Sequence, residues 1–73
     1  MRLKYITDGS KIIVGKSSKE VYARCERCGI FSGYINLTEI DILIYRLNRN
    51  NWKQNEYADN FCPLCVSHVQ ENW

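Results

Sequence analysis

The four cysteines of this chain form two pairs with identical spacing, and this pattern constrains the fold more than any other feature. Cys25–Cys28 and Cys62–Cys65 each read Cys-x-x-Cys; together they account for every cysteine in the 73-residue sequence, and 33 residues separate them. Two intervening residues let the backbone turn so that both sulfurs face one pocket, and four thiolates form a complete tetrahedral shell for Zn²⁺. The sequence therefore predicts one structural zinc per chain, bound by Cys25, Cys28, Cys62 and Cys65.

Two disulfides are one alternative for the same cysteines, because short secreted domains are often disulfide-bonded. A secreted chain needs a signal peptide with a continuous apolar core, and the segment Met1–Gly15 is instead interrupted by the charged residues Arg2, Lys4, Asp8 and Lys11. We therefore expect a cytoplasmic protein with reduced thiols. A thioredoxin-like redox pair needs a βαβ context, for which the chain is too short.

Redox iron is a second alternative. Cys28-Gly29 and Cys62-Pro63 resemble the CxxCG and CPxCG knuckles of rubredoxins. Val66 stands where the second glycine of that pattern falls, and the aromatic motif of the first rubredoxin knuckle is absent. Zinc is therefore favoured, with iron as a metal that can enter such a site adventitiously.

The length of the chain predicts one small domain over residues 1–73, and the pattern of its segments predicts an α+β fold, with a β-hairpin or meander in residues 1–24 and the zinc module in residues 25–69. A core this small supplies little stability by itself, so a metal that joins distant segments should provide much of the folding free energy. No apolar stretch of the sequence reaches membrane-spanning length.

The first third of the sequence favours strands. Leu3–Ile6 and Lys11–Val14 are short apolar runs joined through Asp8-Gly9, a dipeptide typical of tight hairpins. After a second turn at Gly15–Ser18, Glu20–Arg24 alternates in polarity and predicts a third strand that leads to the first cysteine pair.

One long helix is predicted from Thr38, as its capping residue, to about Arg49, because an acidic residue follows the threonine at the spacing of a capping box. Apolar residues recur at helical spacing and define its buried stripe: Ile40, Leu43, Ile44 and Leu47. Beyond the helix, Asn48–Asn51 should break it and Trp52 should begin a return strand. Phe61 then leads into the second cysteine pair, and Val66 and Val69 indicate a short C-terminal helix.

This order of elements resembles the treble-clef and zinc-ribbon families, and in particular small bacterial and phage-encoded zinc proteins. The residues that carry the resemblance extend roughly from Arg24 to Val69 and are Cys25, Cys28, Gly29, Trp52, Phe61, Cys62, Pro63 and Cys65. The resemblance implies metal binding but no single activity, because such modules bind DNA, RNA or protein.

Charge gives a weak indication of nucleic-acid binding. The formal net charge of +2 becomes about 0 once four thiolates (−4) and one Zn²⁺ (+2) are added, which is poor for strong non-specific binding. Four basic residues nevertheless fall around the first pair: Lys16, Lys19, Arg24 and Arg27. They are either a solvated face that offsets the zinc-thiolate charge or a phosphate-binding patch.

A protein partner, or a second copy of the chain, is favoured by the predicted helix. Its 100° step per residue places Ile42 and Tyr45 opposite the buried stripe, where they are either covered by the N-terminal hairpin or the Trp52 segment, or form an interface. Trp52 is expected in the core, and Trp73, at the chain end, is expected to be exposed or docked on a neighbour.

Enzyme chemistry finds little support in the sequence. His68 could replace one cysteine as a ligand, but four cysteines make a surface role or a role beside the site the better prediction. Ser67 and His68 are neighbours with no orienting acid, and phosphate-loop, dinucleotide and kinase motifs are absent. We therefore expect a non-enzymatic zinc module of a bacterium or phage, acting as a regulatory or adaptor protein through protein contacts, with DNA or RNA binding as the alternative.

Overall fold

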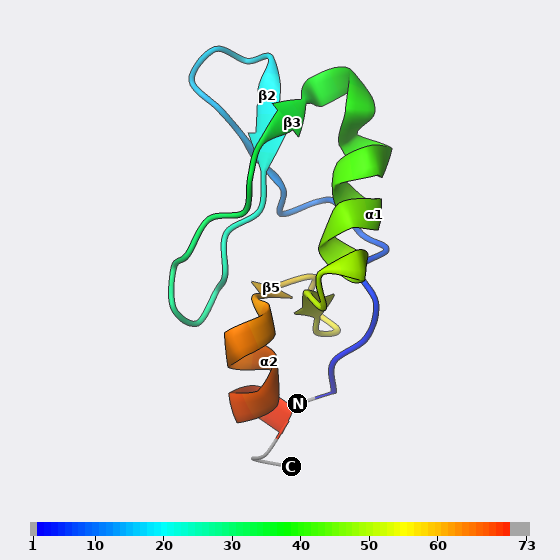
Figure 1. The fold of residues 1–73 in the computed structure, drawn as a ribbon, viewed down its shortest axis with the longest axis vertical. Helices are drawn as coiled ribbons and strands as arrows, with labels where there is room; N and C mark the ends of the chain where they lie inside the picture. Colours follow the sequence, from blue (N-terminus) through cyan, green and yellow to red (C-terminus); the bar gives the residue numbers. More distant parts are fainter. Residues whose placement is uncertain (1, 71–73) are drawn as a thin grey trace.

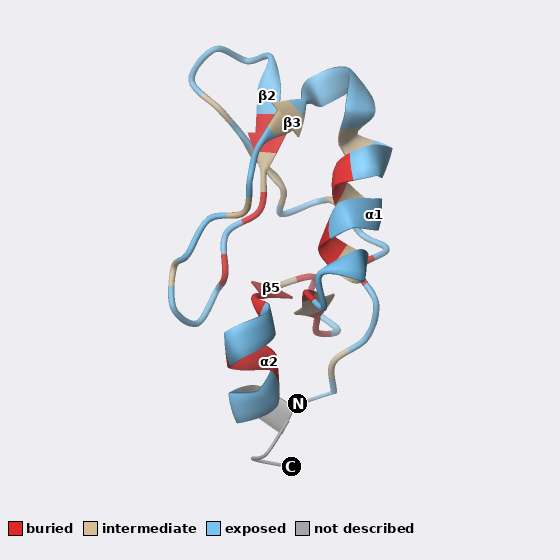
Figure 2. Ribbon diagram, viewed as in Figure 1, coloured by how far each residue is buried: buried red, intermediate tan, exposed pale blue. Residues whose placement is uncertain are grey.

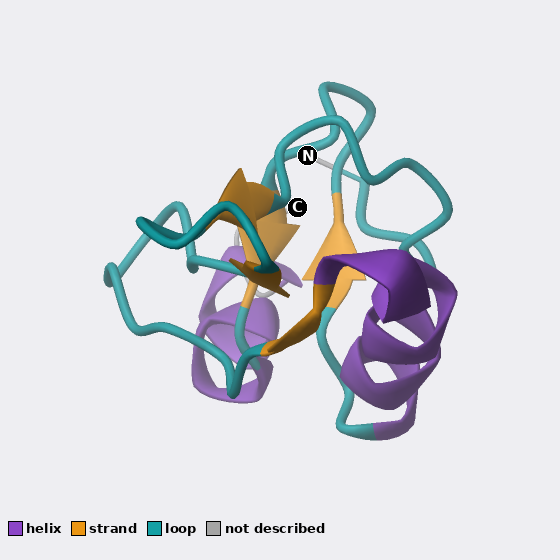
Figure 3. Cartoon of the chain, turned by 90° about the horizontal axis from the view of Figure 1, so that it is seen from above, coloured by secondary structure: helices purple, strands orange, loops and turns teal. Residues whose placement is uncertain are grey.

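The computed structural model describes residues 2–70 and has a small α+β fold (Figure 1). In chain order the elements are β1 (Ile13–Val14), β2 (Glu20–Tyr22), β3 (Ile35–Asn36), the 3-10 turn η1 (Leu37–Glu39), α1 (Ile40–Arg49), β4 (Lys53–Gln54), β5 (Asn60–Phe61) and α2 (Pro63–Gln70). β1, β2 and β3 form one antiparallel sheet in that order, and β4 pairs with β5 in a second. Seen from above, the two helices lie apart from each other (Figure 3).

The turn predicted at Gly15–Ser18 joins β1 to β2. The Gly15 N–H donates to the Glu20 carbonyl at 2.7 Å, and Val14 lies opposite Val21 in the register. The predicted third strand is confirmed as β2, which continues through Ala23 directly into Cys25. The meander therefore delivers the first cysteine pair to the core.

The predicted hairpin between Leu3–Ile6 and Lys11–Val14 is wrong. Lys4 pairs instead with Gln54 of β4, through N–H to carbonyl bonds of 2.9 and 3.0 Å. The Asp8-Gly9 turn does form, since the Ser10 N–H donates to Asp8 Oδ1 at 2.8 Å, but the chain leaves it toward β2.

Two side-chain amides explain this difference, because they form hydrogen bonds with main-chain N–H and carbonyl groups of the N-terminal segment. The Asn48 amide accepts from the Ile6 N–H at 2.8 Å and donates to the Ile6 carbonyl at 3.0 Å. Gln54 Oε1 accepts from the N–H groups of Thr7 and Asp8 at 2.9 and 3.1 Å, and its Nε2 donates to the Asp8 carbonyl at 3.1 Å. The N-terminal segment is thus attached to α1 and β4.

The predicted helix ends at Arg49 as expected, but its cap is not Thr38. The chain makes one 3-10 turn first, and Asn36 Oδ1 accepts from both the N–H and the hydroxyl of Thr38, at 3.0 and 2.9 Å. Asn36 is therefore the capping residue of the 3-10 turn, two positions before Thr38, whereas Glu39, which precedes α1 itself, makes no capping hydrogen bond through its side chain. None of the helices within residues 2–70 is both long and apolar enough to cross a membrane.

The core is formed where α1, β2 and the two cysteine pairs meet (Figure 2). Leu43 and Leu47 of α1 are buried, and Ile40 and Ile44 pack against them, which confirms the predicted stripe. The other buried apolar residues of the cluster are Ile6, Val21, Ala23, Cys25, Trp52, Phe61, Cys62, Cys65 and Val66. Three of the four cysteines thus belong to the core itself.

Candidate metal centre

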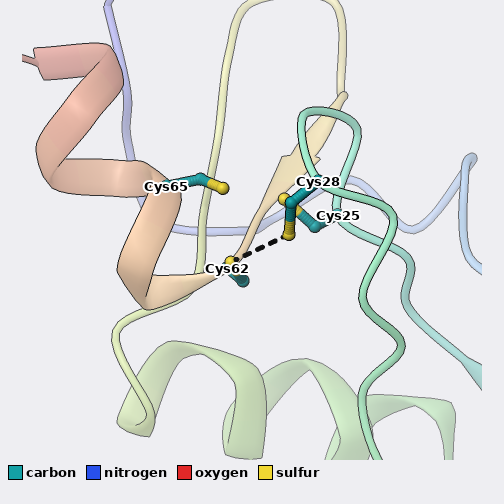
Figure 4. A group of neighbouring side chains, drawn as sticks. All are labelled: Cys25, Cys28, Cys62 and Cys65. Carbon is teal, nitrogen blue, oxygen red and sulfur yellow. Dashed lines mark hydrogen bonds between the residues drawn. The ribbon is translucent and has the colours of Figure 1, made fainter.

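The four cysteines converge at one point, although they come from segments far apart in the sequence (Figure 4). Their sulfur atoms all lie within 4.8 Å of one another, and Cys28 Sγ and Cys62 Sγ are 3.6 Å apart. Four thiolates about 2.3 Å from a central zinc are about 3.8 Å from each other in an ideal tetrahedron. The four cysteines are therefore positioned to bind one metal ion.

The disulfide alternative is contradicted by the same geometry. All four cysteines are free thiols, and the Cys28 to Cys62 sulfur separation of 3.6 Å is much longer than a disulfide bond of about 2.05 Å. His68 is exposed on α2 and does not belong to the group of candidate ligands found among the described residues.

The backbone around the first pair forms a tight loop. The Cys25 N–H donates to the Ile30 carbonyl at 2.8 Å, and the Gly29 N–H donates to the Cys25 carbonyl at 2.9 Å. Gly29 has a φ of +81°, and a Cβ there would lie 3.2 Å from Arg24 Nη2. A glycine is therefore required at the exit of the loop for its conformation.

The second pair is placed by the transition from β5 into α2. Pro63 occupies the first helical position, where the missing N–H costs nothing, and the Cys62 carbonyl accepts from the N–H groups of Cys65 and Val66 at 3.0 and 2.9 Å. The Glu26 N–H donates to the Asn60 carbonyl at 2.8 Å, which joins the two loops directly. These bonds hold the sulfurs together through the main chain.

The surroundings of the thiols differ. Burial would raise the pKa of Cys25, but the backbone N–H groups of Cys28, Cys62 and Arg27 donate to its sulfur and lower that pKa to about 6. Burial raises the pKa of Cys62 to about 12, and burial also raises the pKa of Cys65. Several buried thiols in contact cannot all become anions without a cation between them, so the donor set fits a divalent, thiophilic ion.

Arg27, one of the four basic residues predicted to cluster, contacts this site. Its Nη1 donates to Cys65 Sγ at 3.7 Å. A guanidinium at this position offsets part of the negative charge that four thiolates bring to one metal, and it supports the ligand that it contacts.

The four basic residues predicted to cluster are spread along the β2 strand and its continuation. Lys16 and Lys19 lie in the turn between β1 and β2, whereas Arg24 lies beside Gly29 and Arg27 contacts Cys65. At about 3.3 Å per residue in an extended chain, Lys19 and Arg24 are roughly 16 Å apart along the backbone. This spacing does not favour a compact phosphate-binding patch.

Replacing Lys16, Lys19 and Arg24 together with glutamine is expected to leave zinc content unchanged. If these residues bind nucleic acid, the triple variant should weaken binding to every sequence and flatten its salt dependence by about one counterion per lost contact. Fluorescence anisotropy with a labelled DNA duplex and a labelled RNA, at several salt concentrations, measures both effects. We expect weak binding by the wild type; micromolar or tighter binding at physiological salt would contradict this expectation.

The helix face predicted as an interface is exposed. The side chains of Ile42 and Tyr45 are 42% and 58% accessible, so neither the N-terminal segment nor the Trp52 segment covers them. Arg49 lies 5.7 Å from the centre of the Tyr45 ring, and its Nη1 donates to the Tyr45 hydroxyl at 3.0 Å. Trp52 is buried as predicted, and Trp73 lies outside the described residues.

Sequence reasoning missed an apolar surface beside the metal centre. Four of its side chains are more than half exposed: Ile30, Phe31, Tyr34 and Leu64. Three of them follow the first cysteine pair in a short apolar run, and the fourth lies between the cysteines of the second pair. The apolar run was the sequence feature that pointed to this surface, but it has no regular spacing, so the sequence does not predict which side chains face solvent.

Comparison of the chain with protein-family models, with curated proteins and with solved structures finds no match.

Proposed function

We propose that the chain is a structural zinc module that works by binding a protein partner, as a small regulatory or adaptor protein of a bacterium or phage. The observation that carries the metal assignment is the convergence of four sulfurs within 4.8 Å of one another. Four cysteine ligands leave no coordination position for a water molecule, which supports a structural role and argues against metal-dependent catalysis.

A treble-clef arrangement is the form of zinc module that the connectivity supports best. One cysteine pair lies in a loop after β2, the short hairpin of β4 and β5 follows, and the second pair lies at the start of α2. In this proposal α1 is an insertion between the first pair and the hairpin.

Native mass spectrometry of the protein purified without added metal tests the metal assignment. We expect one Zn²⁺ per chain, released by a strong chelator with loss of secondary structure. Bound iron with a reversible one-electron redox couple would support the rubredoxin-like alternative, and a metal-free folded protein would contradict both assignments.

A role in protein binding is supported by the large apolar side chains that remain exposed in so small a domain. Soluble monomers rarely expose contiguous apolar patches without a use for them. Ile42 and Tyr45 form one exposed pair on α1, and the residues beside the metal centre form another surface. Both can be tested separately.

Substituting Ile42 with serine and Tyr45 with glutamine is expected to preserve zinc content and to change the unfolding free energy by no more than about 1 kcal/mol, since exposed positions rarely cost more. If this face is the interface, the double variant should lose association with a second copy or with the partner. Analytical ultracentrifugation and affinity capture from nuclease-treated lysate measure this. A double variant that unfolds, or that keeps every association of the wild type, would exclude this face as the contact surface.

A further inference from the structure

An open groove of about 540 Å³ lies between the segment that follows the first cysteine pair and one face of α1. One wall is the segment Ile30–Ile35, and the opposite wall carries Leu43 and Leu47 of α1. Trp52 and the start of α2, including Leu64, complete the lining. The volume lies within the range of about 300–1,000 Å³ typical of binding sites.

The groove has a mostly apolar lining and a single charged residue, Arg46. Leu64 and Tyr34 on its rim are 75% and 68% exposed, so large apolar area is left in water. The Arg46 side chain has no ion pair or hydrogen bond with any of residues 2–70. An occupant that matches this surface therefore combines apolar side chains with a carboxylate.

The wall opposite α1 also offers free main-chain groups. The Ser32 N–H donates to the Ala23 carbonyl and the Cys25 N–H donates to the Ile30 carbonyl, both at 2.8 Å, so the peptide groups of Phe31 point away from the neighbouring strand. Neither the N–H nor the carbonyl of Phe31 has a partner within the described residues 2–70.

Gly33, two residues further along, lines the groove with its main chain, and the space beside its Cα is open, with no atom within 4 Å of a Cβ built there. The Phe31 ring contacts the Tyr22 ring, with ring centres 5.2 Å apart in an edge-to-face arrangement. The segment therefore presents a strand edge with free main-chain groups at Phe31 and open space beside Gly33.

We propose that this groove binds an extended segment of a partner protein, which adds as a strand along Phe31–Gly33, inserts alternate apolar side chains toward Leu43 and Leu47, and pairs an acidic side chain with Arg46. Strand addition supplies affinity through main-chain hydrogen bonds, and the groove supplies selectivity through alternate side chains. This inference rests on the proposed protein-binding function and assigns it a surface different from the Ile42 and Tyr45 face.

The metal centre and the groove share residues, because Cys62, Pro63 and Leu64 are part of the groove lining. A metal ion bound by Cys62 would therefore fix one wall of the groove, so the binding experiment must use the zinc-loaded protein.

The probe is a displayed library of random eight-residue peptides, selected on the zinc-loaded protein. We expect enriched peptides with apolar residues at alternate positions and one Asp or Glu.

The best peptide is then synthesised in three forms: unmodified, with the acid replaced by its amide, and with single N-methyl groups along the backbone. The amide form and at least one N-methylated form should bind about tenfold more weakly or worse, as expected for loss of a charge-assisted or main-chain hydrogen bond. Bound peptide should also slow hydrogen exchange at the Phe31 amide.

Two variants and a matched control test the surface. Arg46→Glu should weaken binding by at least about tenfold and favour peptides with Lys in place of the acid. Arg49→Glu makes the same change in charge one turn away, beside Tyr45, and should change affinity by less than about twofold. Leu64→Asp, at a residue 75% exposed, should weaken binding and keeps the test valid if Arg46→Glu does not fold.

Selection that enriches no such peptides, or enriched peptides that bind Arg46→Glu and Leu64→Asp as tightly as the wild type, would overturn the groove proposal. The proposed protein-binding function is then retained only if the double variant Ile42→Ser, Tyr45→Gln loses a partner. It is wrong if neither surface is needed for binding. Self-association that these groove variants abolish would make the groove a dimer interface, which would also overturn the peptide proposal.

Discussion

Replacing Cys62 with serine is expected to yield a protein that retains no stoichiometric metal and is largely unfolded at room temperature. Cys62 is buried at the junction of β5 and α2, and its sulfur lies 3.6 Å from that of Cys28. Serine is a poor zinc ligand. Structural zinc contributes about 10–16 kcal/mol in small zinc domains, which is at least comparable to a whole-domain stability of about 5–15 kcal/mol. Circular dichroism and elemental analysis of the purified variant measure the two effects.

Leu64→Ser is the matched control, because it changes a residue between the two ligands of the same pair while its side chain is 75% exposed. It should keep one zinc and lose no more than about 1 kcal/mol of unfolding free energy. A Cys62→Ser variant with full zinc content and wild-type stability would refute the assignment of Cys62 as a ligand on which the fold depends.

Replacing Gln54 with leucine is expected to lower the unfolding free energy by about 3 kcal/mol, since the side chain makes three hydrogen bonds to main-chain groups and each contributes about 0.5–1.5 kcal/mol. The Gln54 side chain is fully buried and serves Thr7 and Asp8, as described above, so leucine fills the volume but pairs with none of their groups. In a domain of this size the loss corresponds to a melting temperature lower by roughly 12–24 °C. Urea unfolding with excess zinc measures it without interference from metal loss.

Asn50→Ala provides the comparison for an exposed amide. Its side chain makes one hydrogen bond, to the Arg46 carbonyl at 2.8 Å, and lies at the end of α1. We expect it to cost less than about 1 kcal/mol. If Gln54→Leu is no more destabilising than this control, the Gln54 amide does not hold the N-terminal segment in place.

The four-cysteine cluster was predictable from the sequence, because the spacing within each pair is a local signal. Two cysteines separated by two residues can bring their sulfurs together only in a tight turn. Because the sequence contains two such turns and no other cysteine, the two pairs are expected to form one set of four ligands for a single metal ion. The stripe of α1 was predictable for the same reason, since Leu43 and Leu47 follow the helical period and are buried.

The N-terminal pairing was not predictable, because its determinants are two amides more than 40 residues away. Asn48 and Gln54 lie in polar contexts, beside the end of a helix and in a short strand, and nothing in their neighbours indicates that they accept from Ile6 and Thr7. The cap was mispredicted on a smaller scale. Thr38 has the spacing to an acidic residue that a capping box requires, but the chain forms a 3-10 turn before the helix, and Asn36 caps that turn instead.

The attachment of the N-terminal segment to Gln54 has a consequence for the order in which the chain is made. Lys4 is synthesised 50 residues before the residue whose main chain it pairs with. At about 5–20 residues per second, the segment waits roughly 3–10 s for its partner to be added. Cys62 and Cys65 follow later still, so the nascent chain lacks both the pairing of Lys4 with Gln54 and the second cysteine pair until most of residues 2–70 have been translated. This domain can therefore complete its fold only after Cys65 has been translated, and until then the thiols of Cys25 and Cys28 are without the two cysteines with which they converge.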